Sequence, residues 1–149
     1  MRFDYRQIEV DPLPGDDGPQ YVFEPVITVR VVGPAGAWLI RGLLDTGAAE
    51  TIIPLQYLDR LGVPKGPRFD LTGAGGSGFP AWLGTVDLEL SRGRTSYHWS
   101  TRVGFVARRD LALWGRAGFL DYFTATFDGL NKRVTLRPNG TFPDPAVVD

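Results

Sequence analysis

The stretch Gly42-Leu43-Leu44-Asp45-Thr46-Gly47-Ala48 decides how the rest of the chain is interpreted. An apolar run ends directly at an acidic residue, and a second apolar run, Thr51-Ile52-Ile53, resumes within four residues. Because an isolated carboxylate is costly to bury, an apolar strand does not carry an acid into a core without a partner. A turn in which Asp45 accepts a backbone hydrogen bond explains Gly47, but it does not explain why the apolar pattern resumes. Asp45 is therefore the first candidate for a reactive residue.

The composition narrows the chemistry that Asp45 can join. The chain has 149 residues, a net charge of −1, a single histidine and no cysteine. Its length suits one domain, and its small net charge predicts no attraction to nucleic acid or to anionic membranes. The absence of cysteine excludes thiol catalysis, disulfides and Cys-ligated zinc, and one histidine excludes metal sites built from several. Carboxylates are the simplest remaining catalysts, and we expect no metal and no cofactor.

The residue pattern predicts a mostly β chain, because apolar and polar residues alternate between frequent turns formed by 19 Gly and 12 Pro. Strands are expected over 2–10, 21–32, 37–44, 51–53, 69–72, 79–90, 95–106, 124–127 and 133–136. A short helix is expected over 54–62, with Leu55, Leu58 and Leu61 on one face, and a second over 115–122. Together, these strands and helices predict an all-β fold, a small closed β-barrel with one or two short helices.

The chain is expected to have three parts: an N-terminal arm or edge strand over 1–20, a domain over 21–137, and a Pro-rich tail over 138–149. The first part is interpreted, in order of preference, as an extra edge strand, a dimer arm or a removable pro-segment. Within it, Asp16-Asp17-Gly18 is an ordinary turn rather than a cation site, because no further acids follow at a suitable spacing. Neither a membrane-spanning stretch nor the apolar core of a signal peptide is found, so we expect a cytoplasmic protein.

In three places the sequence resembles the retropepsin-like aspartic proteases, the retroviral type of aspartyl protease. The first is the block from Leu43 to Ala48, and the second is a hairpin with a Gly-rich tip over 73–78. The third is Leu113-Trp114-Gly115-Arg116, with the segments 117–123 and 126–128 that follow it. The likeness covers about residues 20–137 and is closest to bacterial single-domain members of the family.

The resemblance implies an acid-protease-like β-barrel that supplies one catalytic carboxylate per chain, Asp45, and therefore a homodimer. Two facing carboxylates share one proton, and the ionised carboxylate draws a proton from a water held between them. That water attacks the peptide carbonyl, whose oxygen accepts a hydrogen bond from the protonated carboxyl. The implied activity is that of an aspartic-type endopeptidase, a hydrolase whose partner is a peptide or protein substrate in an extended conformation.

The resemblance also assigns roles to residues around Asp45. In the active-site loop, Thr46 would hydrogen-bond across the two-fold axis, and Gly47 would let substrate approach the backbone. Ala48 is the third residue expected to support this loop. The flap that closes over substrate would consist of Gly73, Ala74, Gly75, Gly76, Ser77 and Gly78. Further structural support of the loop is expected from Trp114, Gly115, Arg116 and Glu50.

The two positions after Ala48 depart from the family pattern. Viral members often carry acids at both, and one of these acids pairs with the Arg of the Gly-Arg segment. Here the positions hold Ala49 and Glu50, so Arg116 either has another partner, for which Glu50 is the nearest candidate, or has a different role. The altered partner of Arg116 favours an alternative hypothesis, in which the protein is a non-catalytic binding or scaffolding module with the same barrel. The intact Asp45 block argues against this hypothesis.

Three aromatic or titratable side chains outside these motifs have open roles. Phe79 and Trp82 follow the Gly-rich tip and either line substrate subsites or pack within the hairpin. His98 lies in an aromatic segment, and we interpret it as an ordinary strand residue rather than a catalytic one. A third hypothesis for function, beside the endopeptidase and the binding module, is hydrolysis of another substrate by the same carboxylate pair.

Overall fold

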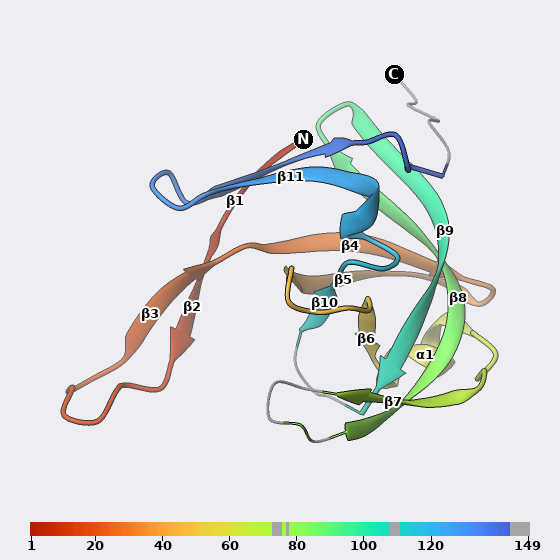
Figure 1. Ribbon diagram of the computed structural model, residues 1–149, viewed down its shortest axis with the longest axis horizontal. Coiled ribbons are helices and arrows are strands. Elements are labelled where there is room, and N and C mark those ends of the chain that lie inside the picture. Colours follow the sequence, from red (N-terminus) through yellow and green to blue (C-terminus); the bar gives the residue numbers. More distant parts are fainter. Residues whose placement is uncertain (73–75, 77, 108–110, 144–149) are drawn as a thin grey trace.

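A closed barrel of six strands forms the body of the protein in a computed structural model, which describes residues 1–72, 76, 78–107 and 111–143. Around the barrel the strands follow in the order β4 (Val26–Gly33), β5 (Gly36–Leu44), β10 (Ala112–Trp114), β6 (Ile52–Pro54), β9 (Thr95–Val106) and β8 (Gly78–Arg92). Pairing of β4 with β8 closes the ring. Figure 1 shows the curved β8 and β9 wrapping around the shorter central strands. The predicted all-β fold with a closed barrel is confirmed.

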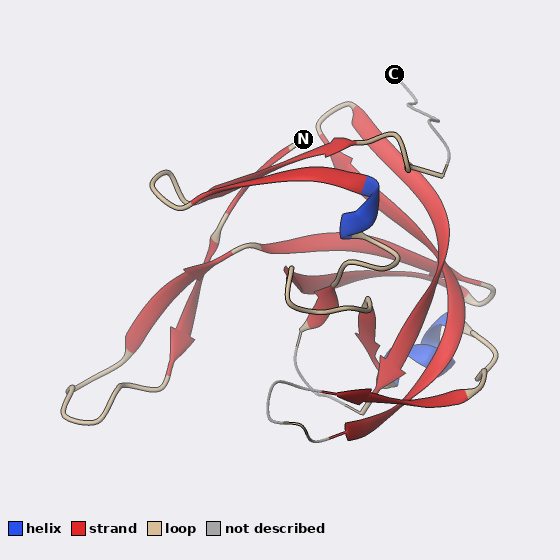
Figure 2. Ribbon diagram, in the orientation of Figure 1, coloured by secondary structure: helices blue, strands red, loops and turns tan. Residues whose placement is uncertain are grey.

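Three smaller groups of strands are attached to the barrel (Figure 2). They are the hairpin of β7 (Arg68–Thr72) with β8, the sheet of β1 (Arg2–Asp4), β12 (Arg133–Pro138) and β11 (Phe123–Asp128), and the hairpin of β2 (Arg6–Val10) with β3 (Gln20–Glu24). The first two groups pack against the body, whereas the β2–β3 hairpin extends away from it. The structure thus joins a closed barrel to a projecting hairpin.

A cluster of aromatic side chains fills one end of the barrel, where the β1–β12–β11 sheet covers it. Trp114 and Phe119 are fully buried and stack with ring centroids 5.4 Å apart. Trp99 meets Phe119 edge-on at 5.3 Å and donates its indole N–H to the carbonyl of Gly118 at 2.9 Å. Burying such large side chains contributes strongly to stability, and here it also holds the segment after Trp114 in place.

The helix predicted over 54–62 is present in shorter form as α1 (Gln56–Leu61). It ends at Gly62, which has φ of 66°, a left-handed conformation that favours glycine at a helix C-terminus. The second predicted helix, over 115–122, is reduced to the 3₁₀ turn Leu120–Tyr122. Gly118 has φ of 87°, and a regular helix therefore cannot pass through this segment.

The structure also corrects several predicted strands. The predicted strand 21–32 is divided at Pro25 into β3 and β4, and the segment 2–10 forms two separate strands, β1 and β2. Proline lacks the N–H that a continuous ladder requires, which explains the break at Pro25. Strand β9 runs unbroken through Gly104, a residue that strand interiors do not favour. Gly104 leaves room for the Phe69 ring, which lies 3.0 Å from the position of a Cβ.

Candidate active site

Asp45 lies directly after β5, at a point where two distant segments of the chain are interleaved. Strand β10 lies between β5 and β6, parallel to β5 and antiparallel to β6. Its last residue, Trp114, is in register with Leu44, the residue before Asp45. The loop that joins β5 to β6 must therefore pass over the end of β10, and this crossing places Asp45 beside the segment that follows Trp114.

Backbone hydrogen bonds hold the Asp45 turn tightly. The N–H of Asp45 donates to the carbonyl of Trp114 at 3.2 Å, and the N–H of Ala48 donates to the carbonyl of Asp45 at 3.2 Å. The N–H of Gly47 donates to the Asp45 carboxylate oxygen Oδ1 at 2.9 Å. The Asp45 residue is only partly buried, so its carboxylate has a fixed orientation and remains accessible to solvent.

A second set of hydrogen bonds ties the Asp45 loop to the segment after β10. The N–H groups of Arg116 and Ala117 donate to the carbonyls of Ala48 and Ala49, each at 2.9 Å. In return, Thr51 donates both its N–H, at 3.1 Å, and its hydroxyl, at 2.8 Å, to the carbonyl of Ala117. Thr51 is 1% exposed. Sequence reasoning missed this positioning residue, and the only available signal was a polar residue at the start of an apolar strand.

Close packing beneath the loop explains two glycines and a tryptophan. A Cβ on Gly115 would overlap the carbonyl of Glu50, and a Cβ on Gly42 would overlap the indole ring of Trp114. The Trp114 indole N–H donates to the carbonyl of Ile27 at 3.4 Å. Trp114 therefore fills the space below the loop, and Gly115 allows the two backbones to touch.

A cavity of about 660 Å³ opens beside Asp45. Its lining residues come from the Asp45 loop, from β6 and β10, and from the β7–β8 hairpin: Asp45, Gly47, Ala48, Ala49, Glu50, Ile52, Leu113, Phe69, Asp70, Leu71, Thr72 and Phe79. Among these residues, Phe69, Leu71 and Leu113 pack with Ile52 in one apolar cluster, and Asp45 places a carboxylate at the cavity wall. The fold thus brings together the predicted loop and the predicted hairpin, which are distant in the sequence.

The other residues predicted near Asp45 differ in whether they line the cavity or contact the loop. Phe79 lines the cavity, whereas Trp82 does not and instead packs under the Lys65 ammonium at 4.0 Å from its ring centroid. Arg116 is exposed, and the ion pairs formed within the described part of the chain include neither Arg116 nor Glu50. Arg116 is connected to the loop through its backbone alone. Its predicted pairing with Glu50 is thus not seen.

Thr46 and the glycine-rich tip complete the predicted set. Thr46 is exposed at the top of the Asp45 turn. Gly76 and Gly78 are exposed, and Gly76 has φ of 75°, a conformation that favours glycine. The other predicted tip residues lie outside the described residues: Gly73, Ala74, Gly75 and Ser77.

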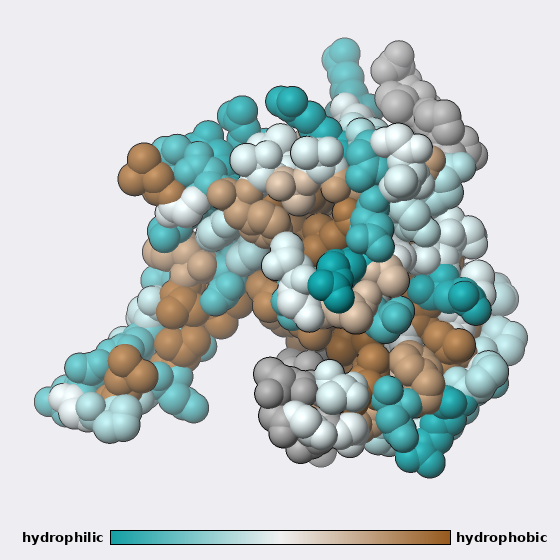
Figure 3. Space-filling model, viewed as in Figure 1, coloured by the Kyte–Doolittle hydropathy of each residue, from teal (hydrophilic) through white to brown (hydrophobic). Residues whose placement is uncertain are grey.

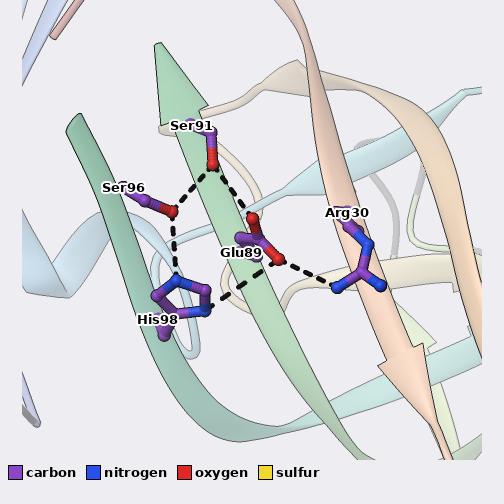
Figure 4. Close-up of polar contacts among 5 residues, drawn as sticks. All are labelled: Arg30, Glu89, Ser91, Ser96 and His98. Carbon is purple, nitrogen blue, oxygen red and sulfur yellow. Dashed lines mark hydrogen bonds and ion pairs between the residues drawn. The ribbon is translucent and has the colours of Figure 1, made fainter. Parts of the chain in front are cut away.

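His98 belongs to a separate polar cluster on the outer face of β8 and β9 (Figure 4). Its Nε2 lies 3.1 Å from the Ser96 hydroxyl, and its Nδ1 lies 4.0 Å from the Glu89 carboxylate. Glu89 accepts its shorter bond, 2.9 Å, from Arg30, and it also accepts the Ser91 hydroxyl at 3.1 Å. The Glu89 carboxylate is therefore engaged by neighbours other than His98, and His98 does not line the cavity at Asp45.

Clusters suited to a metal ion and helices suited to crossing a membrane are absent from the described residues. In that part of the chain no three His, Asp or Glu residues come close enough to hold a metal ion. Asp16, which the sequence placed in an ordinary turn, accepts a hydrogen bond from the Gln20 side chain. The helices within the described ranges include none that is long and apolar enough to cross a membrane.

Comparison with known proteins gives a likeness among solved structures alone. No protein-family model matches the chain, and no curated protein sequence matches it significantly. Among solved structures, the chain is similar to the EIAV protease complexed with the inhibitor HBY-793, at 21% sequence identity and a TM-score of 0.47. The aligned part covers 62% of this chain and 82% of that one.

Proposed function

We propose that the protein is an aspartic endopeptidase whose active site forms when two copies of Asp45, one from each chain of a homodimer, face each other. The observation that carries this proposal is the setting of Asp45. Its carboxylate is oriented by the Gly47 N–H at 2.9 Å, remains accessible, and lies in the wall of a cavity between the loop and the β7–β8 hairpin. A tight turn serving only as a structural cap does not require such a cavity.

The chemistry follows from bringing the two carboxylates close together. Because like charges at short distance repel, the pair holds a single proton. The ionised carboxylate accepts a proton from a bound water, whose oxygen attacks the peptide carbonyl carbon. The protonated carboxyl donates a hydrogen bond to the carbonyl oxygen, and the proton finally passes to the leaving amine as the C–N bond breaks. The residues tying loop 45–51 to segment 114–118 hold each carboxylate in position during these steps.

The cavity supports an extended peptide as substrate. Phe69 and Leu71 on β7 pack with Ile52 and Leu113 of the barrel into one apolar wall of the cavity. A peptide lying along this wall would place apolar side chains in contact with it. The β7–β8 hairpin would act as the flap, closing over the peptide and excluding water from the carboxylates. Apolar side chains flanking the cleaved bond are therefore expected in good substrates.

Asp45→Asn tests the proposal, because asparagine keeps the shape of the side chain but cannot act as a base. Purified wild-type protein and the variant are incubated with a denatured protein mixture from pH 3.5 to 7.5, and new N-termini are quantified by mass spectrometry. We expect cleavage by the wild type and a loss of at least about 10²–10⁴-fold in the variant, the range for removing a general acid–base group. Asp59→Asn, an exposed acid on α1, is the matched control and should retain activity.

Mixing experiments test whether the site is shared between two chains. Adding excess Asp45→Asn chain to the wild type should reduce cleavage, because mixed dimers contain only one carboxylate. Equal cleavage by wild type and Asp45→Asn would identify a contaminating protease. Absence of cleavage by the wild type across the pH range, in a sample shown to be dimeric, would overturn the endopeptidase proposal and favour a binding module.

A further inference from the structure

The β2–β3 hairpin, here named the arm (residues 6–24), is attached to the barrel only at its root. At that root the Tyr5 N–H donates to the carbonyl of Lys132 at 2.7 Å, and the Arg6 guanidinium donates to the Thr28 hydroxyl at 3.2 Å. Beyond the root, β2 and β3 form a two-stranded sheet of their own and, within the described ranges, pair with no other strand. A lone two-stranded hairpin is only marginally stable in water, so the arm requires a surface to cover it.

The arm exposes apolar side chains on its outer face. Tyr21 and Phe23 are 52% and 49% exposed, and they share this face because they alternate with the residues that point toward the barrel. At the tip, Leu13 is 67% exposed. Each of the two strands also has one edge without a partner strand, which is a ready template for another chain. These features are typical of a surface that binds a protein.

The inner face of the arm is apolar as well, and it stands apart from the barrel. Ile8 and Val22 are register partners on this face. Ile8 lines a cavity of about 620 Å³ together with Leu39 of β5 and Leu111, and Leu39 is 70% exposed. Figure 3 shows the notch between arm and barrel, with apolar side chains on the side of the arm that borders it. Ile8 and Val22 on this face are partly buried, whereas Tyr21 and Phe23 on the outer face are about half exposed.

The position of the arm relative to Asp45 indicates what covers it. Figure 1, a view down the shortest axis of the molecule, places the arm and the loop between β5 and β6 on the same side of the barrel. If two Asp45 carboxylates are to meet, the second chain must approach from that side. The arm then extends alongside the second chain, because it projects past the loop that carries Asp45.

We propose that the arm is a dimerisation element that grips a second copy of this chain, with Tyr21 and Phe23 among its contacts. This inference rests on the proposed pairing of Asp45 residues, since that pairing defines where the second copy lies. In a two-fold symmetric dimer both arms make the same contact, so each side chain contributes twice.

Two variants test the arm without disturbing the barrel. In the first, residues 6–24 are replaced by Gly-Asn-Gly, which can join Tyr5 to Pro25 because Arg6 and Glu24 are directly paired across the hairpin. In the second, Tyr21→Ala and Phe23→Ala are combined. Dimer dissociation constants are measured by analytical ultracentrifugation in the Asp45→Asn background, which prevents self-cleavage. We expect dissociation constants raised at least about tenfold by the double substitution, as for aromatic interface anchors, and further by the replacement.

A cross-linking experiment locates the contact directly. Because the chain contains no cysteine, Phe23→Cys provides a unique site for a benzophenone maleimide, again in the Asp45→Asn background. Irradiation should yield covalent dimers on a denaturing gel, and mass spectrometry should place the cross-link between two chains. The matched control is Arg94→Cys, an exposed residue in the β8–β9 turn away from the arm, which should yield only background cross-linking.

Failure of the arm proposal is distinguishable from failure of the proposed function. If both arm variants keep the wild-type dissociation constant and Asp45-dependent cleavage is intact, the arm does not mediate dimerisation. The proposed endopeptidase function would be unaffected. If the arm replacement increases cleavage at an unchanged dissociation constant, the dimerisation proposal would also be overturned. The arm would then be an inhibitory pro-segment. Arm-dependent dimers and cross-links without any Asp45-dependent cleavage would support the arm and overturn the endopeptidase. A wild-type chain that remains monomeric at high concentration would overturn both.

Discussion

The Asp45 loop and the arm are both exposed segments on one side of the barrel, yet they are stabilised in opposite ways. The loop is crossed by the segment after β10, and each backbone holds the other through hydrogen bonds of 2.8–3.2 Å above a fully buried Trp114. The arm is held at its root and by its own ladder, with Tyr21 and Phe23 about half exposed. The first segment is positioned by its own chain, whereas the second has the features of one that a partner positions.

This difference corresponds to the two requirements of the proposed shared active site. A carboxylate that must act at a defined distance from its counterpart needs a rigid support, which the crossed segments provide. An element that must bind another chain needs apolar surface that its own chain leaves uncovered, which the arm provides. Substitutions in the two regions should consequently affect different measurable quantities, stability in one and association in the other.

The largest effect is expected from Trp114→Ala. Trp114 is fully buried, stacks on Phe119, and fills the space beneath the Asp45 loop. Removing it should reduce the free energy of unfolding by about 3–5 kcal/mol, as for other buried aromatic residues, measured by urea denaturation of dilute protein. Trp38→Ala is the control, because Trp38 is 42% exposed. A loss of similar size in both variants would contradict the view that Trp114 supports the loop from within the core.

A smaller but more local effect is expected from Gly115→Ala. The added Cβ would overlap the carbonyl of Glu50 and force the two crossed backbones apart. We expect a loss of about 1–3 kcal/mol in unfolding free energy, together with reduced cleavage, since Asp45 would shift. Gly129→Ala adds the same methyl group at a position with no atom within 4 Å and should change neither quantity. Full activity in Gly115→Ala would indicate that the crossing does not position Asp45.

The smallest effect on stability is expected in the arm. Phe23→Ala should change the unfolding free energy of the monomer by no more than about 0.5 kcal/mol, as for surface substitutions without special contacts. Phe119→Ala, the same change at a fully buried phenylalanine, should cost about 3–5 kcal/mol. The unfolding of both is measured by urea denaturation at a concentration where chains are monomeric. A large loss in Phe23→Ala would mean that the arm is packed against its own barrel.

Much of the fold could be predicted from local patterns. The alternation of apolar and polar residues located most strands, and the leucines at 55, 58 and 61 located the short helix. The errors came from single residues whose effect depends on context. Pro25 interrupts a ladder that appeared continuous, and Gly118 in a left-handed conformation replaces the second helix by one 3₁₀ turn.

The candidate site was predictable in part. Asp45 stood out because an acid between two apolar runs requires a special environment, and Trp114 and Gly115 were placed near it through the family resemblance. Thr51 was not found, because its partner is a backbone carbonyl contributed from Ala117. The partner expected for Arg116 was wrong in kind, since Arg116 contacts the loop through its N–H rather than through its side chain.

The sequence by itself determined the β character of the chain, and it predicted carboxylate chemistry with Asp45 as its centre. These depend on residue type and on spacing along the chain. Only the tertiary structure decided that β10 lies between β5 and β6, that the Asp45 loop and the β7–β8 hairpin share a cavity, and that the arm stands apart from the barrel. Strand order depends on pairing between distant residues, which no local pattern encodes.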